Sequence, residues 1–154
     1  MKARTIVMTL VLCFVGVTVC YADDPMMGTW NLNEAKSKLS PGMSKNTTVV
    51  YAAMGENVKI TIDGTDSSGK PAHSEWMGEL DGKDYPVTGS PNTDTRALTK
   101  VNDRTVTFTE KQNGKVTFTG RIVVAADGKS RTVTSSGTDA KGNKVKGTAV
   151  YDKQ

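Results

Sequence analysis

Short runs that alternate apolar and polar residues, separated by closely spaced turn signals, constrain the fold of this chain more than any other feature. The clearest run is Thr105-Val106-Thr107-Phe108-Thr109, in which Val and Phe face one side and Thr faces the other. Alternation of this kind, rich in β-branched residues, predicts half-buried strands. Asn113–Gly114 is the strongest hairpin signal, and similar dipeptides separate the other alternating runs.

The pattern predicts an all-β fold. We expect about ten strands, at residues 28–33, 46–53, 57–63, 73–79, 84–88, 94–100, 104–111, 115–124, 130–137 and 144–151. Strands joined in order by tight turns predict an antiparallel up-and-down meander, which at this strand number tends to close into a barrel. A two-sheet β-sandwich is the alternative. One segment, Leu32–Leu39, has room for a short helix capped by Asn33. No domain boundary is visible within residues 23–154.

The first 22 residues are typical of a signal peptide. Lys2 and Arg4 precede an uncharged apolar run, Thr5–Val19, and small residues place a cleavage site near Ala22. Cleavage would leave a secreted or periplasmic protein that begins at residue 23. The alternatives are an uncleaved anchor and a lipid attached to Cys20, because the residues before it resemble a lipobox.

Removal of this segment would also change the charge and the cysteine content. The full chain has 20 Lys and Arg against 16 Asp and Glu, and loss of Lys2 and Arg4 leaves 18 against 16. Charges of both signs are interspersed, so no basic patch predicts nucleic-acid binding. Cys13 and Cys20 both lie in the leader, so the mature chain would have no disulfide and no cysteine nucleophile.

The sequence contains few residues in arrangements typical of catalytic sites. His73 is the single histidine, and no nucleophile motif accompanies it. His73 and Glu75 share one face of a strand, which could in principle make a proton-sharing or metal-binding pair, but a surface ion pair is the favoured interpretation. We therefore predict no enzyme activity, no metal site and no cofactor.

The residues Gly28-Thr29-Trp30 resemble a motif of a known protein group. A Gly-x-Trp on the first strand of a secreted chain, followed by an antiparallel meander, looks like the lipocalin and fatty-acid-binding-protein group, the calycins. "GTWNLN" with "DGKDYPVTG" also resembles a set of small uncharacterised secreted bacterial proteins. The resemblance implies that Trp30 closes one barrel end beneath a basic side chain, with Arg121 and Arg131 as the candidates, while Gly28 lets the strand bend. The simpler alternative is that Trp30 is a core aromatic.

The resemblance implies a barrel that binds a small apolar or amphipathic molecule. The candidate lining residues share an aromatic side chain: Trp30, Tyr51, Trp76, Tyr85, Phe108 and Phe118. The last strand contains Tyr151 but no Arg, so the carboxylate site of fatty-acid-binding proteins is incomplete. Small residues at strand interiors, such as Gly78 and Gly120, predict either bends or cavity space. The alternative function is a structural or protein-interaction module with a filled core.

Overall fold

The described part of the chain is almost entirely β-structure. The computed structural model describes residues 24–139 and 141–154, so the predicted signal peptide at residues 1–22 lies outside it. The described residues form these elements: β1 (Gly28–Leu32), η1 (Glu34–Lys36), β2 (Lys38–Leu39), β3 (Lys45–Met54), β4 (Asn57–Thr65), β5 (Pro71–Gly78), β6 (Asp81–Thr88), β7 (Thr95–Asn102), β8 (Thr105–Gln112), β9 (Lys115–Val124), β10 (Ser130–Thr138) and β11 (Lys144–Lys153). A membrane-spanning helix is absent from residues 24–139 and 141–154.

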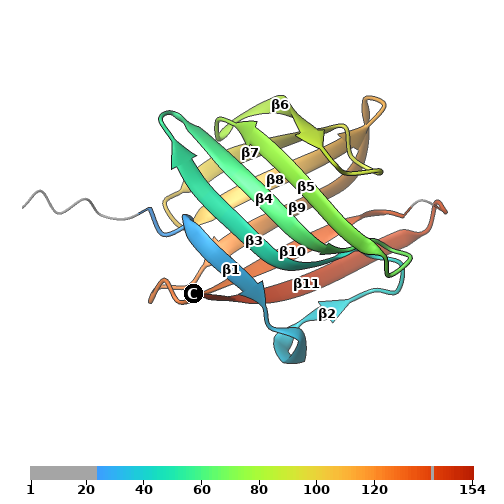
Figure 1. Cartoon of the computed structure of the whole chain (residues 1–154), viewed down its shortest axis with the longest axis horizontal. Helices are drawn as coiled ribbons and strands as arrows, with labels where there is room; N and C mark the ends of the chain where they lie inside the picture. Colours follow the sequence, from blue (N-terminus) through green and yellow to red (C-terminus); the bar gives the residue numbers. More distant parts are fainter. Residues whose placement is uncertain (1–23, 140) are drawn as a thin grey trace, which may run out of the picture.

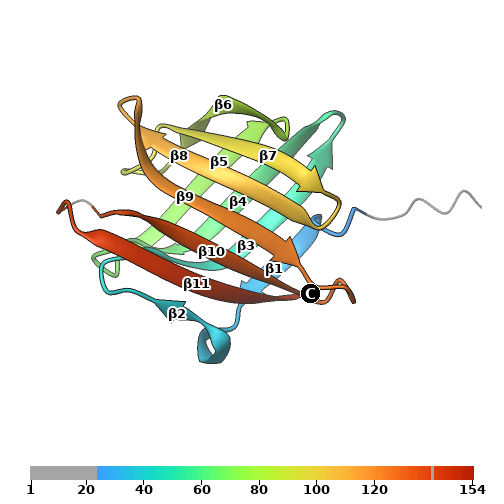
Figure 2. The same ribbon diagram turned by 180° about the vertical axis from the view of Figure 1, so that it is seen from behind.

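These strands close into a barrel. From β3 to β11 each strand pairs antiparallel with the next one along the chain, and β1 pairs with both β3 and β11. Figures 1 and 2 show this ring, with β1 lying beside β11 near the C-terminus. The fold is therefore a closed up-and-down barrel of ten strands with β2 as an extra strand. The predicted all-β meander is confirmed, and the two-sheet sandwich is excluded because the pairing forms one continuous ring.

The helix predicted across residues 32–39 shrinks to a single turn. Only Glu34–Lys36 are helical, as a 3-10 turn, and strand structure resumes two residues later. The side chain of Asn33 caps this turn, as predicted, by accepting a hydrogen bond from the Lys36 amide at 3.2 Å. Propensity alone overestimated the helix, because the residues on both sides find strand partners on β11.

A serine side chain maintains the pairing with β11 where the first strand is interrupted. Ser37 Oγ accepts a hydrogen bond from the Val150 amide at 2.9 Å, and the Asn33 amide donates to the Val150 carbonyl at 2.8 Å. Beyond this point β2 pairs with β11 through Lys38 and Leu39. Both the amide and the carbonyl of Val150 are thus hydrogen-bonded, although neither β1 nor β2 pairs with β11 at this residue.

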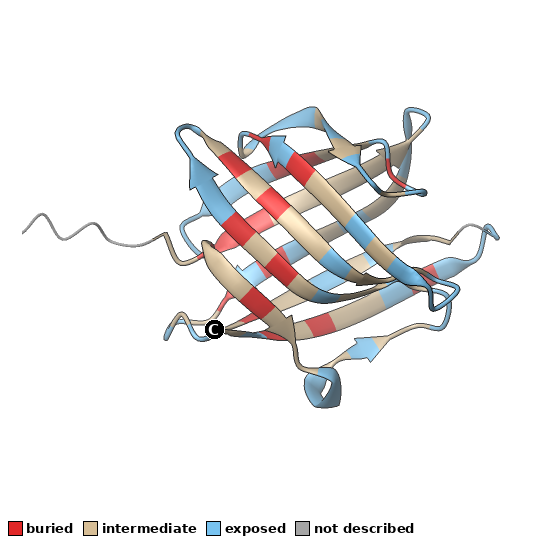
Figure 3. Ribbon diagram, in the orientation of Figure 1, coloured by how far each residue is buried: buried red, intermediate tan, exposed pale blue. Residues whose placement is uncertain are grey.

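Burial alternates along the strands, and Figure 3 shows this as bands across the sheet. The fully buried side chains of the core include Trp30, Ile60, Trp76, Leu98 and Val106. Asn113 and Gly114 form the tight turn between β8 and β9, and both have positive φ, at 51° and 74°. This geometry is that of a two-residue hairpin turn, as the sequence predicted.

Aromatic rings lie over the glycines of the inner face. A side chain added to Gly120 would collide with the ring of Phe108, its cross-strand partner, and one added to Gly137 would collide with Phe118. Gly78 lies in the same way against Tyr85. The glycines therefore create space that neighbouring rings fill, a device known to stabilise glycines within sheets.

One apolar residue of β9 departs from the alternation and faces solvent. Strict alternation would place Val116 on the same inner face as Phe118, but 57% of its surface is exposed. The register between β8 and β9 shifts between Glu110 and Lys111, so Phe118 lies opposite Glu110 whereas Val116 lies opposite Lys111. The extra residue in this bulge ends the alternation that holds along the rest of β9.

Candidate functional site

One end of the barrel is plugged by Trp30. Its side chain is completely buried, and its indole Nε1 donates to the Met26 carbonyl at 3.0 Å. The guanidinium carbon of Arg131 lies 4.7 Å from the ring centroid, and Lys153 Nζ lies 5.2 Å from it. Gly28 has a φ of 109°, and a side chain there would meet Lys153. Gly28, Trp30 and Arg131 thus meet at one end.

Arg121, the other candidate cation, does not join this cluster. It lies opposite Thr107 on β8 and Thr134 on β10, and its side chain is on the exposed outer face. Arg131 has the opposite orientation and is only 2% exposed. The strand alternation explains the difference, because Arg131 shares the inner face of β10 with Val133.

Arg131 is surrounded by aromatic rings instead of carboxylates. Its guanidinium carbon lies 4.7 Å from the Tyr51 ring centroid and 5.0 Å from that of Tyr151. Its Nε and Nη1 atoms make no hydrogen bond with the described residues. Burial lowers the pKa of Arg131, whereas the two tyrosines act in the opposite direction. Burial also raises the pKa of Tyr151 to about 12. The three rings fill the space around the arginine and keep water from its charge. The cluster is therefore suited to closing this end of the barrel.

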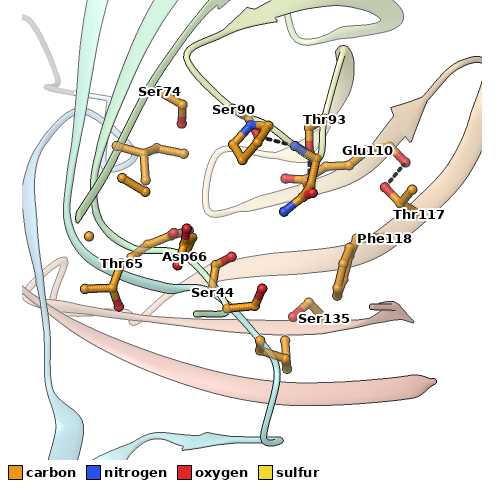
Figure 4. A pocket seen from close by; sticks show the side chains of 18 of the residues that line it. Ser44, Thr65, Asp66, Ser74, Ser90, Thr93, Glu110, Thr117, Phe118 and Ser135 are labelled. Carbon is orange, nitrogen blue, oxygen red and sulfur yellow. Dashed lines mark hydrogen bonds between the residues drawn. The ribbon is translucent and has the colours of Figure 1, made fainter. Parts of the chain in front are cut away.

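The opposite end of the barrel contains a cavity of about 230 Å³. Its apolar wall is formed by side chains from several strands, namely Leu39, Ile62, Phe108, Phe118 and Val133. Figure 4 shows the polar groups around it, with Ser74 and Thr93 on one side and Ser44 and Ser135 on the other. Tyr151 also lines the cavity, and its hydroxyl donates to the Asn46 carbonyl at 3.0 Å. The cavity therefore lies on the side of Tyr151 away from the plugged end.

Of the six aromatic residues predicted to line a ligand site, the structure places two at this cavity, Phe108 and Phe118. Trp30 and Tyr51 lie in the plug around Arg131. The remaining two, Trp76 and Tyr85, pack edge to face with ring centroids 5.8 Å apart and do not line the cavity. Their rings fill the core instead, with Tyr85 over Gly78.

An ion pair in the cavity wall was not predicted. Arg96 and Glu110 are directly opposite on β7 and β8, and Arg96 Nη2 and Nε both donate to Glu110 Oε1, at 2.6 Å and 3.0 Å. Their side chains are only 12% and 17% exposed. Thr93 Oγ1 donates to the other carboxylate oxygen at 3.3 Å. The alternation could have predicted that both side chains face inward. Arg96 is two residues from inward Leu98, and Glu110 is two residues from inward Phe108.

His73 and Glu75 do not pair with each other. His73 Nδ1 lies 2.7 Å from Asp63 Oδ1, and Glu75 forms an ion pair with Lys59 at 2.9 Å. Glu75 lies on the outer surface of the sheet, while exposed His73 borders the mouth of the cavity. Among residues 24–139 and 141–154, no three His, Cys, Asp or Glu side chains group in a way that could hold a metal ion.

Comparison with solved structures shows a likeness to a β-barrel. No model of a known protein family matches the chain. No curated protein matches it either. A redesigned β-barrel, mFAP1, solved with bound DFHBI, is similar to 82% of this chain and 94% of its own, with 19% identity and a TM-score of 0.45.

Proposed function

We propose that this protein is a secreted or periplasmic binding protein that holds a small apolar or amphipathic molecule at the open end of its barrel. The observation that carries the proposal is the cavity of about 230 Å³, whose aromatic and aliphatic walls are interspersed with many polar side chains. A concave site with apolar walls and convergent polar groups can bury part of a small amphipathic molecule and fix its orientation. A barrel whose only task was structural would be expected to fill its interior to normal packing density.

The two ends of the barrel differ in a way that suits this function. The rings and long side chains around Trp30 pack one end tightly, whereas the other end is bordered by small polar residues such as Ser74 and Ser135. A ligand would therefore enter between the loops at residues 66–70 and 89–94, which follow β4 and β6. The plug would keep water out of the cavity floor and preserve the shape of the site.

The cavity sets the size of the ligand. An apolar cavity of about 150 Å³ holds benzene, which has six heavy atoms. By the same ratio, about 230 Å³ holds a molecule with roughly nine non-hydrogen atoms inside the barrel. A longer molecule would have to extend through the mouth.

Native mass spectrometry tests the proposal. The full-length gene product would be expressed in a bacterial envelope, purified gently, and measured before and after organic extraction. We expect a mature chain that begins at Asp23, with an extra mass that extraction removes. A chain that carries an added lipid mass at Cys20 would support the anchored alternative instead.

Two neighbouring serines provide a matched pair of variants. Ser135 lines the cavity, whereas Ser136 is exposed on the outer face of the same strand. Ser135→Leu should remove the extra mass because the larger side chain occupies the cavity, and Ser136→Leu should retain it. If the wild-type protein carries no ligand and binds none of a set of small aromatic probes, the filled-core module becomes the correct function.

A further inference from the structure

From the Arg96–Glu110 pair we infer the chemical class of the ligand, and this inference rests on the proposed function. The geometry points to a ligand whose buried polar end is uncharged and both accepts and donates hydrogen bonds, as a primary amide does. Both residues line the cavity, and no other Arg, Lys or Glu of the described part of the chain does so. The pair is therefore the principal charged feature that a ligand's polar end would meet within the barrel.

The pair leaves one donor group and one acceptor site free. Arg96 uses Nε and Nη2 to bind Glu110 Oε1, and its Nη1 group makes no hydrogen bond with the described residues. Nη1 is also not among the fully enclosed unpaired atoms, and Arg96 is one of the residues that line the cavity. Glu110 Oε2 accepts only from Thr93, which leaves a lone pair available. A ligand with one acceptor and one donor can bind Nη1 of Arg96 and Oε2 of Glu110 at the same time.

The charges of the pair disfavour an ionised ligand. Arg96 is already neutralised by Glu110 at 2.6 Å, so a bound carboxylate would place a second negative charge beside Glu110. A bound ammonium would in turn face the free Nη1 group of Arg96. Either ionised head group would lose its water on binding without gaining an unpaired partner of opposite charge, and this loss is costly.

The charged groups at the mouth do not reverse this balance. Asp66 and Asp139 line the outer part of the cavity, and each accepts hydrogen bonds within its own turn, from residues such as Ser68 and Asn143. These bonds lower the pKa of both carboxyl groups, so both stay ionised at neutral pH. His73, also at the mouth, is held by Asp63. None of these groups is paired with Arg96 or Glu110.

A probe series with one common ring tests the inference. Phenylacetamide, phenylacetate and phenethylammonium share a benzyl group and differ in the head group, and toluene has no head group. Binding would be measured at pH 7 by calorimetry and by amide chemical shifts. We expect phenylacetamide to bind the wild-type protein at least tenfold more tightly than either ion, and more tightly than toluene.

A charge-removing variant should reverse the preference. Glu110→Gln leaves Arg96 as an unpaired cation, so phenylacetate should become the tightest of the four probes. Glu75→Gln is the matched control, because it makes the same change on the outer face and should leave the order unaltered. A circular dichroism spectrum would establish that each variant is folded.

The outcomes separate this inference from the function on which it rests. The inference is overturned if either ion binds wild-type protein as tightly as the amide, if toluene binds as tightly as the amide, or if folded Glu110→Gln keeps the wild-type order. The proposed function remains in each of these cases. If none of the four probes binds, the inference is also overturned, and if the purified protein in addition carries no removable mass, the proposed function fails with it.

Discussion

Arg131 and Tyr151 are cross-strand partners on β10 and β11, and the guanidinium carbon lies 5.0 Å from the centroid of the tyrosine ring. The rings of Trp30, Tyr51 and Tyr151 surround the guanidinium of Arg131. A buried arginine is usually paired with a carboxylate instead. The stability of the plugged end therefore depends on contact with rings, and the positive charge itself carries a desolvation cost.

The first prediction separates the contacts of Arg131 from its charge. Arg131→Ala should lower the free energy of unfolding by about 3 kcal/mol, because it opens a cavity between three rings. Arg131→Met should cost only about 1 kcal/mol, because it retains much of the packing and removes an unpaired buried charge. Urea unfolding measures both. The exposed Arg121→Met should stay within about 0.5 kcal/mol of wild type.

Equal losses in Arg131→Met and Arg131→Ala would contradict this prediction. They would show that the cation attracts the rings by more than its burial costs.

The second prediction concerns alkaline pH. Burial raises the pKa of Tyr151 to about 12, from 10 in the unfolded chain, so the folded state retains the phenolic proton over this interval. The protonated phenol of Tyr151 makes its full contribution to the free energy of unfolding below pH 10, and this contribution is lost as the pH rises through 12. Two pKa units correspond to about 3 kcal/mol. Tyr151→Phe should remove this part of the decline, and urea unfolding between pH 9 and 12 measures it.

At pH 7 the same variant should be less stable by about 1 kcal/mol, because it loses the hydrogen bond to the Asn46 carbonyl. If wild type and Tyr151→Phe lose stability in parallel above pH 10, Tyr151 does not cause the decline.

The third prediction tests the ring that covers Gly120. Gly120→Ala should cost about 2 kcal/mol, because the new methyl group would collide with the Phe108 ring and the Thr134 carbonyl, and the latter belongs to the backbone. The neighbouring Thr119→Ala faces solvent and should cost less than about 1 kcal/mol. Thermal unfolding compares them. A neutral Gly120→Ala would show that Phe108 has room to move.

The fourth prediction uses Trp76 as a reporter of the site. Its Nε1 donates to the Arg96 carbonyl at 2.9 Å, so a ligand held by the Arg96 side chain should change the fluorescence of Trp76. Trp30 lies in the plug beside Arg131 and should not respond. Trp76→Phe should abolish the ligand-dependent signal, and Trp30→Phe should preserve it. A signal that disappears only in Trp30→Phe would place the ligand at the plugged end.

The strand order followed from the sequence because alternation and turn residues act locally. The run Thr105–Thr109 and the turn Asn113–Gly114 specify a hairpin without help from the rest of the chain. The same alternation distinguishes Arg131 from Arg121, because the former shares a face with Val133 and the latter with Thr119. The exposure of Val116 does not follow from alternation, because a bulge depends on how two strands pair, which the sequence of one strand does not reveal.

The candidate site was predicted less well for a related reason. Aromatic residues were expected around a ligand, but Trp76 and Tyr85 are large enough to fill the core themselves. The cavity lies instead where inward residues are small or polar, and there the register brings Arg96 and Glu110 opposite each other. Which side chains meet across β7 and β8 depends on the register of that hairpin, which shifts between Lys100 and Asn102, so the site became visible only with the structure.

The seam between β1 and β11 has a kinetic consequence. Trp30 pairs with Lys153, so the ring closes through residues more than a hundred positions apart in the sequence. Contacts this distant slow folding, because the entropy of a long loop is lost before they form. During synthesis the first strand must wait for the last, and until Lys153 has left the ribosome both edges of the sheet remain open to proteases, chaperones and other chains.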